Sequence, residues 1–205
     1  MTGFGALRQF LSQILSPPVA YVPGSLLLHI DGNLRPLRNI SASADVLCYM
    51  LHTGVQIHIT EKALPLHDAL FIQSRFTVTG TADPECASGE LIITKRRITG
   101  SKNDALKWKS TTPRAIPALS DTLKKHPDIL SLSLLCRLHF HTLTLDVARG
   151  RWEMIIDPVE ASMTISGGSG RQYHSFNPTQ RYTLLALADA VHEQLAHVRS
   201  SHINE

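Results

Sequence analysis

Between residues 72 and 79 the chain reads IQSRFTVT, a stretch in which apolar and polar residues alternate. Successive side chains of a β-strand point to opposite faces, so this alternation predicts a strand whose buried face carries Ile72, Phe76 and Val78. A strand with one buried face and one wet face is typical of an antiparallel sheet. We therefore expect a sheet that is covered on one side only.

Further extended segments, separated by turn residues, lie on both sides of this strand. In chain order the expected strands are 26–30, 46–51, 55–60, 72–79, 91–99, 105–111, 138–147, 151–156 and 159–165. The first is interpreted as a strand because the strong turn pair Asp31-Gly32 follows it, and residues 166–176 are interpreted as a glycine-rich loop. The pattern predicts about seven to nine strands in total.

Helices are expected at both ends of the chain. Near the C-terminus, Asn177 is a suitable N-cap, Pro178 suits the first helical position and Gln180 completes a capping box, which predicts a helix over 177–200. An amphipathic helix and linker are expected in 1–18, where apolar residues recur at helical spacing: Phe4, Leu7, Phe10, Leu11, Ile14 and Leu15. Residues 129–138 fit a helix or a strand, with the helix favoured.

These elements predict the fold class. Helices before and after a run of strands indicate a single α+β domain over residues 1–205. In this fold a mainly antiparallel sheet is flanked by an N-terminal amphipathic helix and a long C-terminal helix. The hydrophobic content of 43% is that of an ordinary globular protein.

Cysteine usage and the absence of targeting patterns bear on location. Cys48, Cys86 and Cys136 are far apart and form no CxxC pair, which indicates reduced thiols in a cytoplasmic protein. No apolar run reaches the roughly 18 residues of a membrane span. The first fifteen residues lack the basic start of a secretory signal. We expect a cytoplasmic protein without a transmembrane segment.

Charge is unevenly distributed along the chain. Residues 95–125 contain nine basic and two acidic residues, a formal charge of +7. The remainder contains eleven basic and fifteen acidic residues, a formal charge of −4. Segregation of this kind favours an anionic partner, such as an anionic macromolecule or an acidic protein. Nucleic acid is not specifically indicated, because no helix-turn-helix, zinc-finger or RNP signature is present.

Within this segment, residues 100–104 are rich in turn formers and predict a hairpin in which Thr99 faces Ala105. That register would place Arg97 opposite Lys107 and Lys95 opposite Lys109. Four cations would then share one face, while Arg96 would lie opposite Trp108 on the other. The candidate anion-binding residues are Lys95, Arg96, Arg97, Lys107, Trp108 and Lys109. An alternative is that these cations only protect an edge hairpin from aggregation.

Two other groups of residues are weaker candidates for chemistry. His139 and His141 are two apart on an expected strand, and His58 on another strand is a conceivable third metal ligand. Arg171, Tyr173 and His174 lie in the expected glycine-rich loop, which could act as a binding loop. The loop has neither a P-loop nor a dinucleotide-binding pattern, and we expect no cofactor.

Three functions remain open at this level. The first is a non-enzymatic binding module that uses the basic hairpin. The second is a carrier with an apolar cavity between the sheet and the C-terminal helix. The third is a metal-dependent hydrolase around His58, His139 and His141. The sequence does not assign an enzyme class or an oligomeric state.

Overall fold

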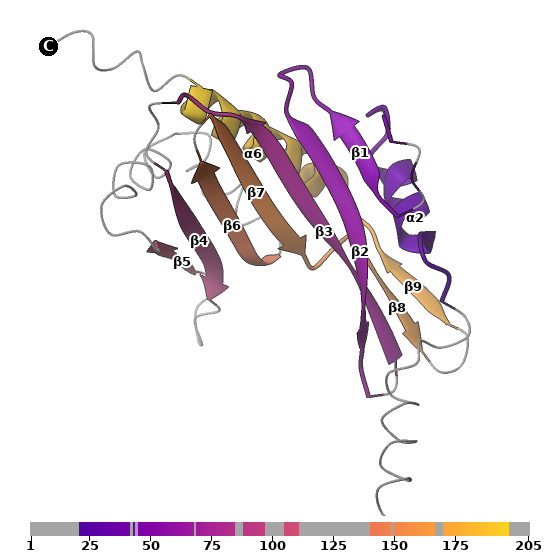
Figure 1. The fold of residues 1–205 in the computed structure, drawn as a ribbon. Coiled ribbons are helices and arrows are strands. Elements are labelled where there is room, and N and C mark those ends of the chain that lie inside the picture. Colours follow the sequence, from indigo (N-terminus) through magenta and orange to yellow (C-terminus); the bar gives the residue numbers. More distant parts are fainter. Residues whose placement is uncertain are drawn as a thin grey trace, which may run out of the picture.

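The computed structural model describes residues 21–41, 43, 45–67, 69–84, 88–96, 105–110, 140–148, 150–166 and 170–196. Nine strands of one sheet and two helices lie in this part of the chain (Figure 1). Their bounds are α2 (Ser25–Asn33), β1 (Leu47–Met50), β2 (Gln56–Pro65), β3 (Ala69–Thr81), β4 (Gly89–Arg96), β5 (Ala105–Ser110), β6 (Phe140–Ala148), β7 (Arg151–Pro158), β8 (Ser162–Ser166), β9 (Arg171–His174) and α6 (Pro178–Ala196). The predicted α+β class and antiparallel sheet are confirmed. The expected helix in 1–18 and residues 129–138 lie outside the described residues.

Strand β3 joins two branches of the sheet. The main path runs β1-β2-β3-β7-β6-β4-β5, and every pairing along it is antiparallel. On the edge away from β2, the second half of β3 pairs with β7 and its first half pairs with β8, which in turn pairs with β9. The 13 residues of β3 therefore carry both branches (Figure 1).

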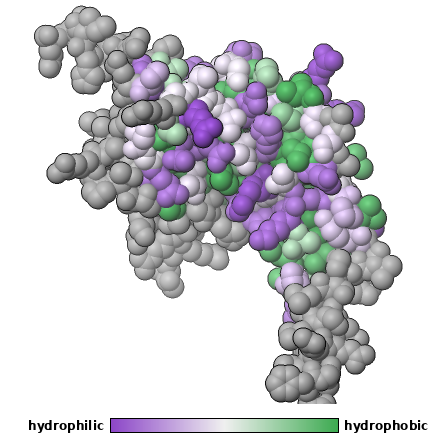
Figure 2. Space-filling view, viewed as in Figure 1, coloured by the Kyte–Doolittle hydropathy of each residue, from purple (hydrophilic) through white to green (hydrophobic). Residues whose placement is uncertain are grey.

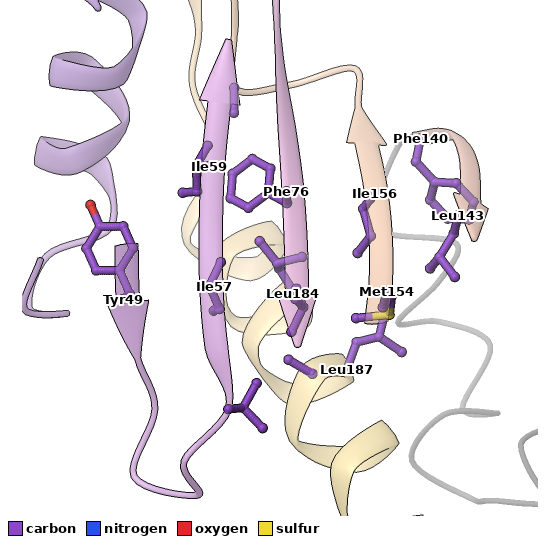
Figure 3. Close-up of a cluster of buried hydrophobic side chains, with 14 of the residues drawn as sticks. Tyr49, Ile57, Ile59, Phe76, Phe140, Leu143, Met154, Ile156, Leu184 and Leu187 are labelled. Carbon is purple, nitrogen blue, oxygen red and sulfur yellow. The ribbon is translucent and has the colours of Figure 1, made fainter. Parts of the chain in front are cut away.

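One face of the sheet is buried and carries the core. Ile72, Phe76 and Val78 are fully buried as predicted, and their neighbours at alternate positions of β2 and β7 are buried too. Figure 3 shows Leu184 and Leu187 of α6 packed among Ile57, Phe76 and Met154. Burying each large apolar side chain contributes roughly 1.5–3 kcal/mol, so this layer dominates the stability of the fold. These buried side chains lie between the sheet and α6.

Helix α6 begins at the predicted capping box. The Asn177 side chain accepts a hydrogen bond from the backbone N–H of Gln180 at 2.8 Å, and the Gln180 side chain accepts one from the N–H of Asn177 at 3.0 Å. At the other end, the N–H of Asp83 donates to the carbonyl of Leu195 at 3.0 Å. The predicted apolar stripe is buried as far as Leu195. Residues 197–200 of the predicted helix lie outside the described residues.

Residues 26–30 form part of helix α2, so the predicted strand at this position was wrong. Leu26, Leu27 and Ile30 are buried while Leu28 is 78% exposed, a pattern that fits a helix and not a strand. The start of this helix is capped by a side chain from another element of the fold. A carboxylate from β2, that of Glu61, accepts hydrogen bonds from the backbone N–H groups of Gly24 at 2.5 Å and Leu27 at 3.3 Å.

Glu61 holds the start of α2 against the covered face of the sheet. It also accepts a hydrogen bond from the hydroxyl of Tyr21 at 2.7 Å. Burial, together with this bond, raises the pKa of Tyr21 well above its ordinary value. A second link joins α2 to β1, where the hydroxyl of buried Tyr49 donates to Asp31 at 2.7 Å. Negative charge at a helix N-terminus is favourable, so Glu61 stabilises α2 by charge as well as by hydrogen bonding.

Two further differences from the sequence prediction lie between residues 159 and 176. The expected strand 159–165 begins only at Ser162, because Val159 is exposed and Ala161 has a positive φ of 53°. The expected glycine-rich loop contains strand β9, which pairs with β8. Pairing with an existing strand satisfies the backbone of this polar segment without any apolar alternation. The expected strands 46–51 and 55–60 pair as the hairpin β1–β2, and those at 138–147 and 151–156 pair as β6–β7.

Replacing Glu61 by glutamine tests the link between β2 and α2. The variant Glu61→Gln keeps the shape but removes the negative charge that faces two backbone N–H groups and a hydroxyl, so we expect a loss of about 1–3 kcal/mol of unfolding free energy. Chemical denaturation measures it. As a control, Glu193→Gln removes an exposed carboxylate from α6 and should change the stability by less than about 0.5 kcal/mol. Equal losses in the two variants would contradict a capping role for Glu61.

Candidate functional site

The uncovered face of the sheet is polar. Residues that alternate with the buried ones along β2, β3 and β7 are mostly exposed or half-buried polar residues. Figure 2 shows hydrophilic residues gathered over the middle of this face. Arg75 of β3 and Asp157 of β7 form a two-pronged ion pair here, with Nε–Oδ1 and Nη2–Oδ2 distances of 2.8 Å. This hydrogen bond raises the pKa of Arg75.

A groove of about 460 Å³ lies where β2, β3, β6 and β7 run side by side. Six polar side chains at alternate positions of these strands line it: Gln56, Thr79, Thr81, Asp146, Arg151 and Glu153. Its size is in the range of small-molecule sites. Because the six residues come from four strands, only the folded sheet brings them together.

The floor of the groove consists of Gly80 and Trp152, which are opposite one another in the β3–β7 pairing. Trp152 is only 1% exposed, and its indole lies against Gly80 on the covered face. A Cβ atom at position 80 would come within 2.7 Å of the indole Nε1 and Cε2 atoms. Real structures essentially never show such a contact, so position 80 has room for glycine alone unless the indole moves.

Carboxylates stand in register beside the groove. Glu153 of β7 is opposite Asp146 of β6, which is in turn opposite Glu90 of β4. Like charges at directly opposed positions of an antiparallel pair are destabilising, by a few tenths of a kcal/mol each. The row continues with Thr79 and Gln56 on the other side of Glu153. The groove therefore has an acidic side and a neutral side that can donate hydrogen bonds.

The predicted basic hairpin exists, but its register differs from the prediction by three residues. Strands β4 and β5 pair with Arg96 opposite Ala105, so that Lys107 faces Thr94 and Lys109 faces Ile92. No cation is opposite another cation in this ladder, and the predicted four-cation face is not formed. Buried Leu91 is opposite Leu145 of β6, so pairing on the other edge of β4 holds its position against the core.

Strand β5 ends the main path of the sheet, so among the described residues no strand pairs with its outer edge. Lys95, Arg96, Lys107, Trp108 and Lys109 all lie on this hairpin by backbone position, but their side chains are outside the described part of the structure. Arg97 lies wholly outside it. The five candidate residues that the structure describes therefore lie on the last two strands of the main path, in a different register from the one expected.

Two of the three candidate histidines, His58 and His141, lie on strands that are not neighbours in the sheet. His58 is on β2 and His141 on β6, with β3 and β7 between them, a separation of about 14 Å at the usual strand spacing. His139 and the side chain of His141 lie outside the described residues. Within the described residues, no group of three His, Cys, Asp or Glu side chains could hold a metal ion.

His58 has two neighbours on the open face. Its Nε2 atom lies 3.8 Å from the Cys48 sulfur and 3.3 Å from the Gln56 side-chain oxygen. Both contacts use the same ring nitrogen, so Gln56 does not orient the imidazole from the opposite side as an activated nucleophile requires. Burial also raises the pKa of the Cys48 thiol, which favours its unreactive form. The arrangement does not resemble a catalytic cysteine site.

The predicted loop residues Arg171, Tyr173 and His174 lie on β9. Tyr173 stacks on His29 of α2 with ring centroids 4.2 Å apart, and the His29 Nε2 atom is 2.6 Å from the hydroxyl of Ser175. His174 is 3.4 Å from the hydroxyl of Thr164. His29 and Ser175 were missed because they are 146 residues apart in sequence. In the described structure no carboxylate hydrogen-bonds His29. Its contacts join α2 to Tyr173 of β9 and to Ser175, which directly follows β9.

A family model described as "Protein of unknown function (DUF3156)" matches residues 32–195. The chain belongs to this family. The DUF3156 match includes all nine strands and almost all of α6, so both the groove and the basic hairpin lie within it. No curated protein and no solved structure matches the chain. Neither described helix combines the length and apolar character needed to cross a membrane.

Replacing Gly80 by alanine tests the floor of the groove. The added methyl group collides with the indole of Trp152, so we expect Gly80→Ala to lower the unfolding free energy by about 1–3 kcal/mol. Thermal or chemical unfolding measures it. The matched control is Gly32→Ala in α2, where nothing lies within 4 Å of the new Cβ and alanine favours the helix. We expect Gly32→Ala to raise the unfolding free energy. If Gly80→Ala left the unfolding free energy unchanged, the indole of Trp152 would not be held in place.

Proposed function

We propose that this protein is a non-enzymatic binding module that holds an acidic polypeptide segment against the β4–β5 hairpin. The observation that carries the proposal is the position of β5. It is the last strand of the main sheet path and lies in the segment 95–125, whose formal charge is +7. The most basic part of the chain therefore contains a strand edge.

An edge strand and a cluster of cations together suit one kind of partner. Among the described residues no strand pairs with the outer edge of β5, and an extended peptide could add to its backbone N–H and C=O groups as a further strand. The cations of the hairpin attract negative charge and accelerate encounter with it. A nucleic acid could use the charge but not the strand edge, so the combination favours an acidic polypeptide.

The proposal does not rest on repulsion within the hairpin. In the observed register each cation is opposite a neutral residue, so the hairpin needs no anion to be stable. Support comes instead from the contrast between +7 in this segment and −4 in the remainder. The competing explanation is that Lys107 and Lys109 protect the edge from aggregation, and it predicts no specific partner.

The other two functions have less support. An apolar carrier needs a cavity between the sheet and α6, whereas this space holds the buried core side chains (Figure 3). A metal-dependent hydrolase around three histidines needs His58 beside His141, whereas two strands lie between theirs. The binding module is therefore the function that we carry forward.

Charge reversal on β5 tests the proposal. Fluorescence anisotropy with labelled poly-L-glutamate should show binding that weakens steeply as salt screens the charges. The double variant Lys107→Glu/Lys109→Glu should bind at least about tenfold more weakly, because two attractive contacts become repulsive. Circular dichroism checks that the sheet is retained.

The control is Lys62→Glu, which reverses an exposed cation on β2 outside the basic segment and should leave the affinity within about twofold. A labelled oligouridylate is the comparison probe. Tighter binding of the oligouridylate would overturn the choice of a polypeptide partner. The absence of binding to either probe, or equal losses in both charge reversals, would overturn the proposal as a whole.

A further inference from the structure

The groove on the open face is separate from the basic hairpin, and none of the residues that line it lies on β4 or β5. It is a concavity of about 460 Å³ whose walls include an amide, two threonine hydroxyls, two carboxylates and a guanidinium. The charged side chains Asp146, Arg151 and Glu153 are all exposed. In the described part of the structure, none of the three forms a hydrogen bond or an ion pair with another side chain.

The unpaired charges of the groove contrast with a pair on the same two strands. Further along β3 and β7, Arg75 and Asp157 neutralise each other through two hydrogen bonds of 2.8 Å. The sheet thus pairs opposite charges across β3 and β7 at that position. In the groove, Glu153 is instead opposite Thr79 on one side and Asp146 on the other, so neither neighbouring strand places a positive charge opposite it.

The registers place opposite charges at two ends of the groove. Asp146 and Glu153 are directly opposed, which brings their Cβ atoms to about 5 Å and makes their mutual repulsion unfavourable. An ammonium group between them would relieve it. Arg151 lies two residues before Glu153 on the same face of β7, about 7 Å away along the strand, and can hold a carboxylate.

Neutral groups complete the site at both ends. Thr79 and Gln56 continue the row that contains the two carboxylates, and Thr81 is opposite Arg151. The first two can hydrogen-bond a ligand beside its ammonium group, and Thr81 can donate to an anion beside the guanidinium. Backbone at Gly80 and Trp152 forms the floor between the ends.

We infer that this groove binds a small zwitterion whose ammonium and carboxylate groups are about 7 Å apart. The ammonium group lies between Asp146 and Glu153, and the carboxylate lies against Arg151. A short peptide or an ω-amino acid has this chemistry. The binding is separate from the proposed contact of β5 with an acidic polypeptide and does not depend on it.

Three probes of matched length test the inference by isothermal titration calorimetry on the full chain at low salt. These are ε-aminocaproate, which carries both charges, hexylamine, which carries only the ammonium group, and hexanoate, which carries only the carboxylate. We expect ε-aminocaproate to bind about fivefold more tightly than hexylamine, and hexanoate to bind most weakly. Equal affinity for ε-aminocaproate and hexylamine would exclude a role for Arg151. A lack of any binding would overturn the site.

Variants then locate the binding. Asp146→Asn and Glu153→Gln should each weaken ε-aminocaproate about fivefold, and Arg151→Gln should weaken it without weakening hexylamine. The control Glu193→Gln removes an exposed carboxylate from α6, which packs against the covered face, and should change nothing. The Lys107→Glu/Lys109→Glu protein should bind ε-aminocaproate like the wild type, whatever its affinity for poly-L-glutamate. Loss of affinity in Glu193→Gln equal to that in Asp146→Asn would show that the binding is elsewhere.

Discussion

Strand β3 is the constraint on which the rest of the sheet depends. Its buried positions, from Leu70 to Val78, form a continuous strip in the core. A shift of one residue would turn that strip to water and the polar strip to the core, so the register of β3 is strongly held. Strand β2 pairs with one edge of β3. On the other edge of β3, β7 pairs with the second half and β8 with the first half. The position of each branch therefore follows from that of β3.

A sheet held in this way separates stability from recognition. The covered face packs against α2 and α6. Two hydrogen bonds fasten α2 to the sheet: Glu61 of β2 accepts one from the N–H of Gly24, and Asp31 of α2 accepts one from the hydroxyl of Tyr49 on β1. No described helix packs against the open face. Besides the ion pair of Arg75 and Asp157, this face carries the charges of Asp146 and Glu153, which no described side chain neutralises. Removing a charge from the groove should therefore change binding much more than folding.

The two proposed sites use different properties of the same sheet. At the edge, β5 has backbone groups with which no described strand pairs, and it lies in a positively charged segment, so we propose an extended partner there. On the open face, four adjacent strands contribute side chains to a groove that suits a small ligand. Their charges differ in sign, since carboxylates line one side of the groove while the hairpin is basic. A single partner is thus not expected to occupy both.

The sequence by itself determined the elements whose signals are local. Alternation in 72–79, the extended segments 46–51 and 55–60, and the capping box of Asn177 and Gln180 each specify structure through residues that are neighbours in the chain, and the structure confirms them. Tertiary structure decided what depends on distant partners. Glu61, which is 37 residues beyond Gly24, accepts a hydrogen bond from the N–H of that glycine at the start of α2. The polar segment 171–174 forms β9 because it pairs with β8, and pairing with β6 holds the register of β4. The groove also belongs to this second group, because strand pairing alone places Gln56, Thr79, Asp146 and Arg151 around one space.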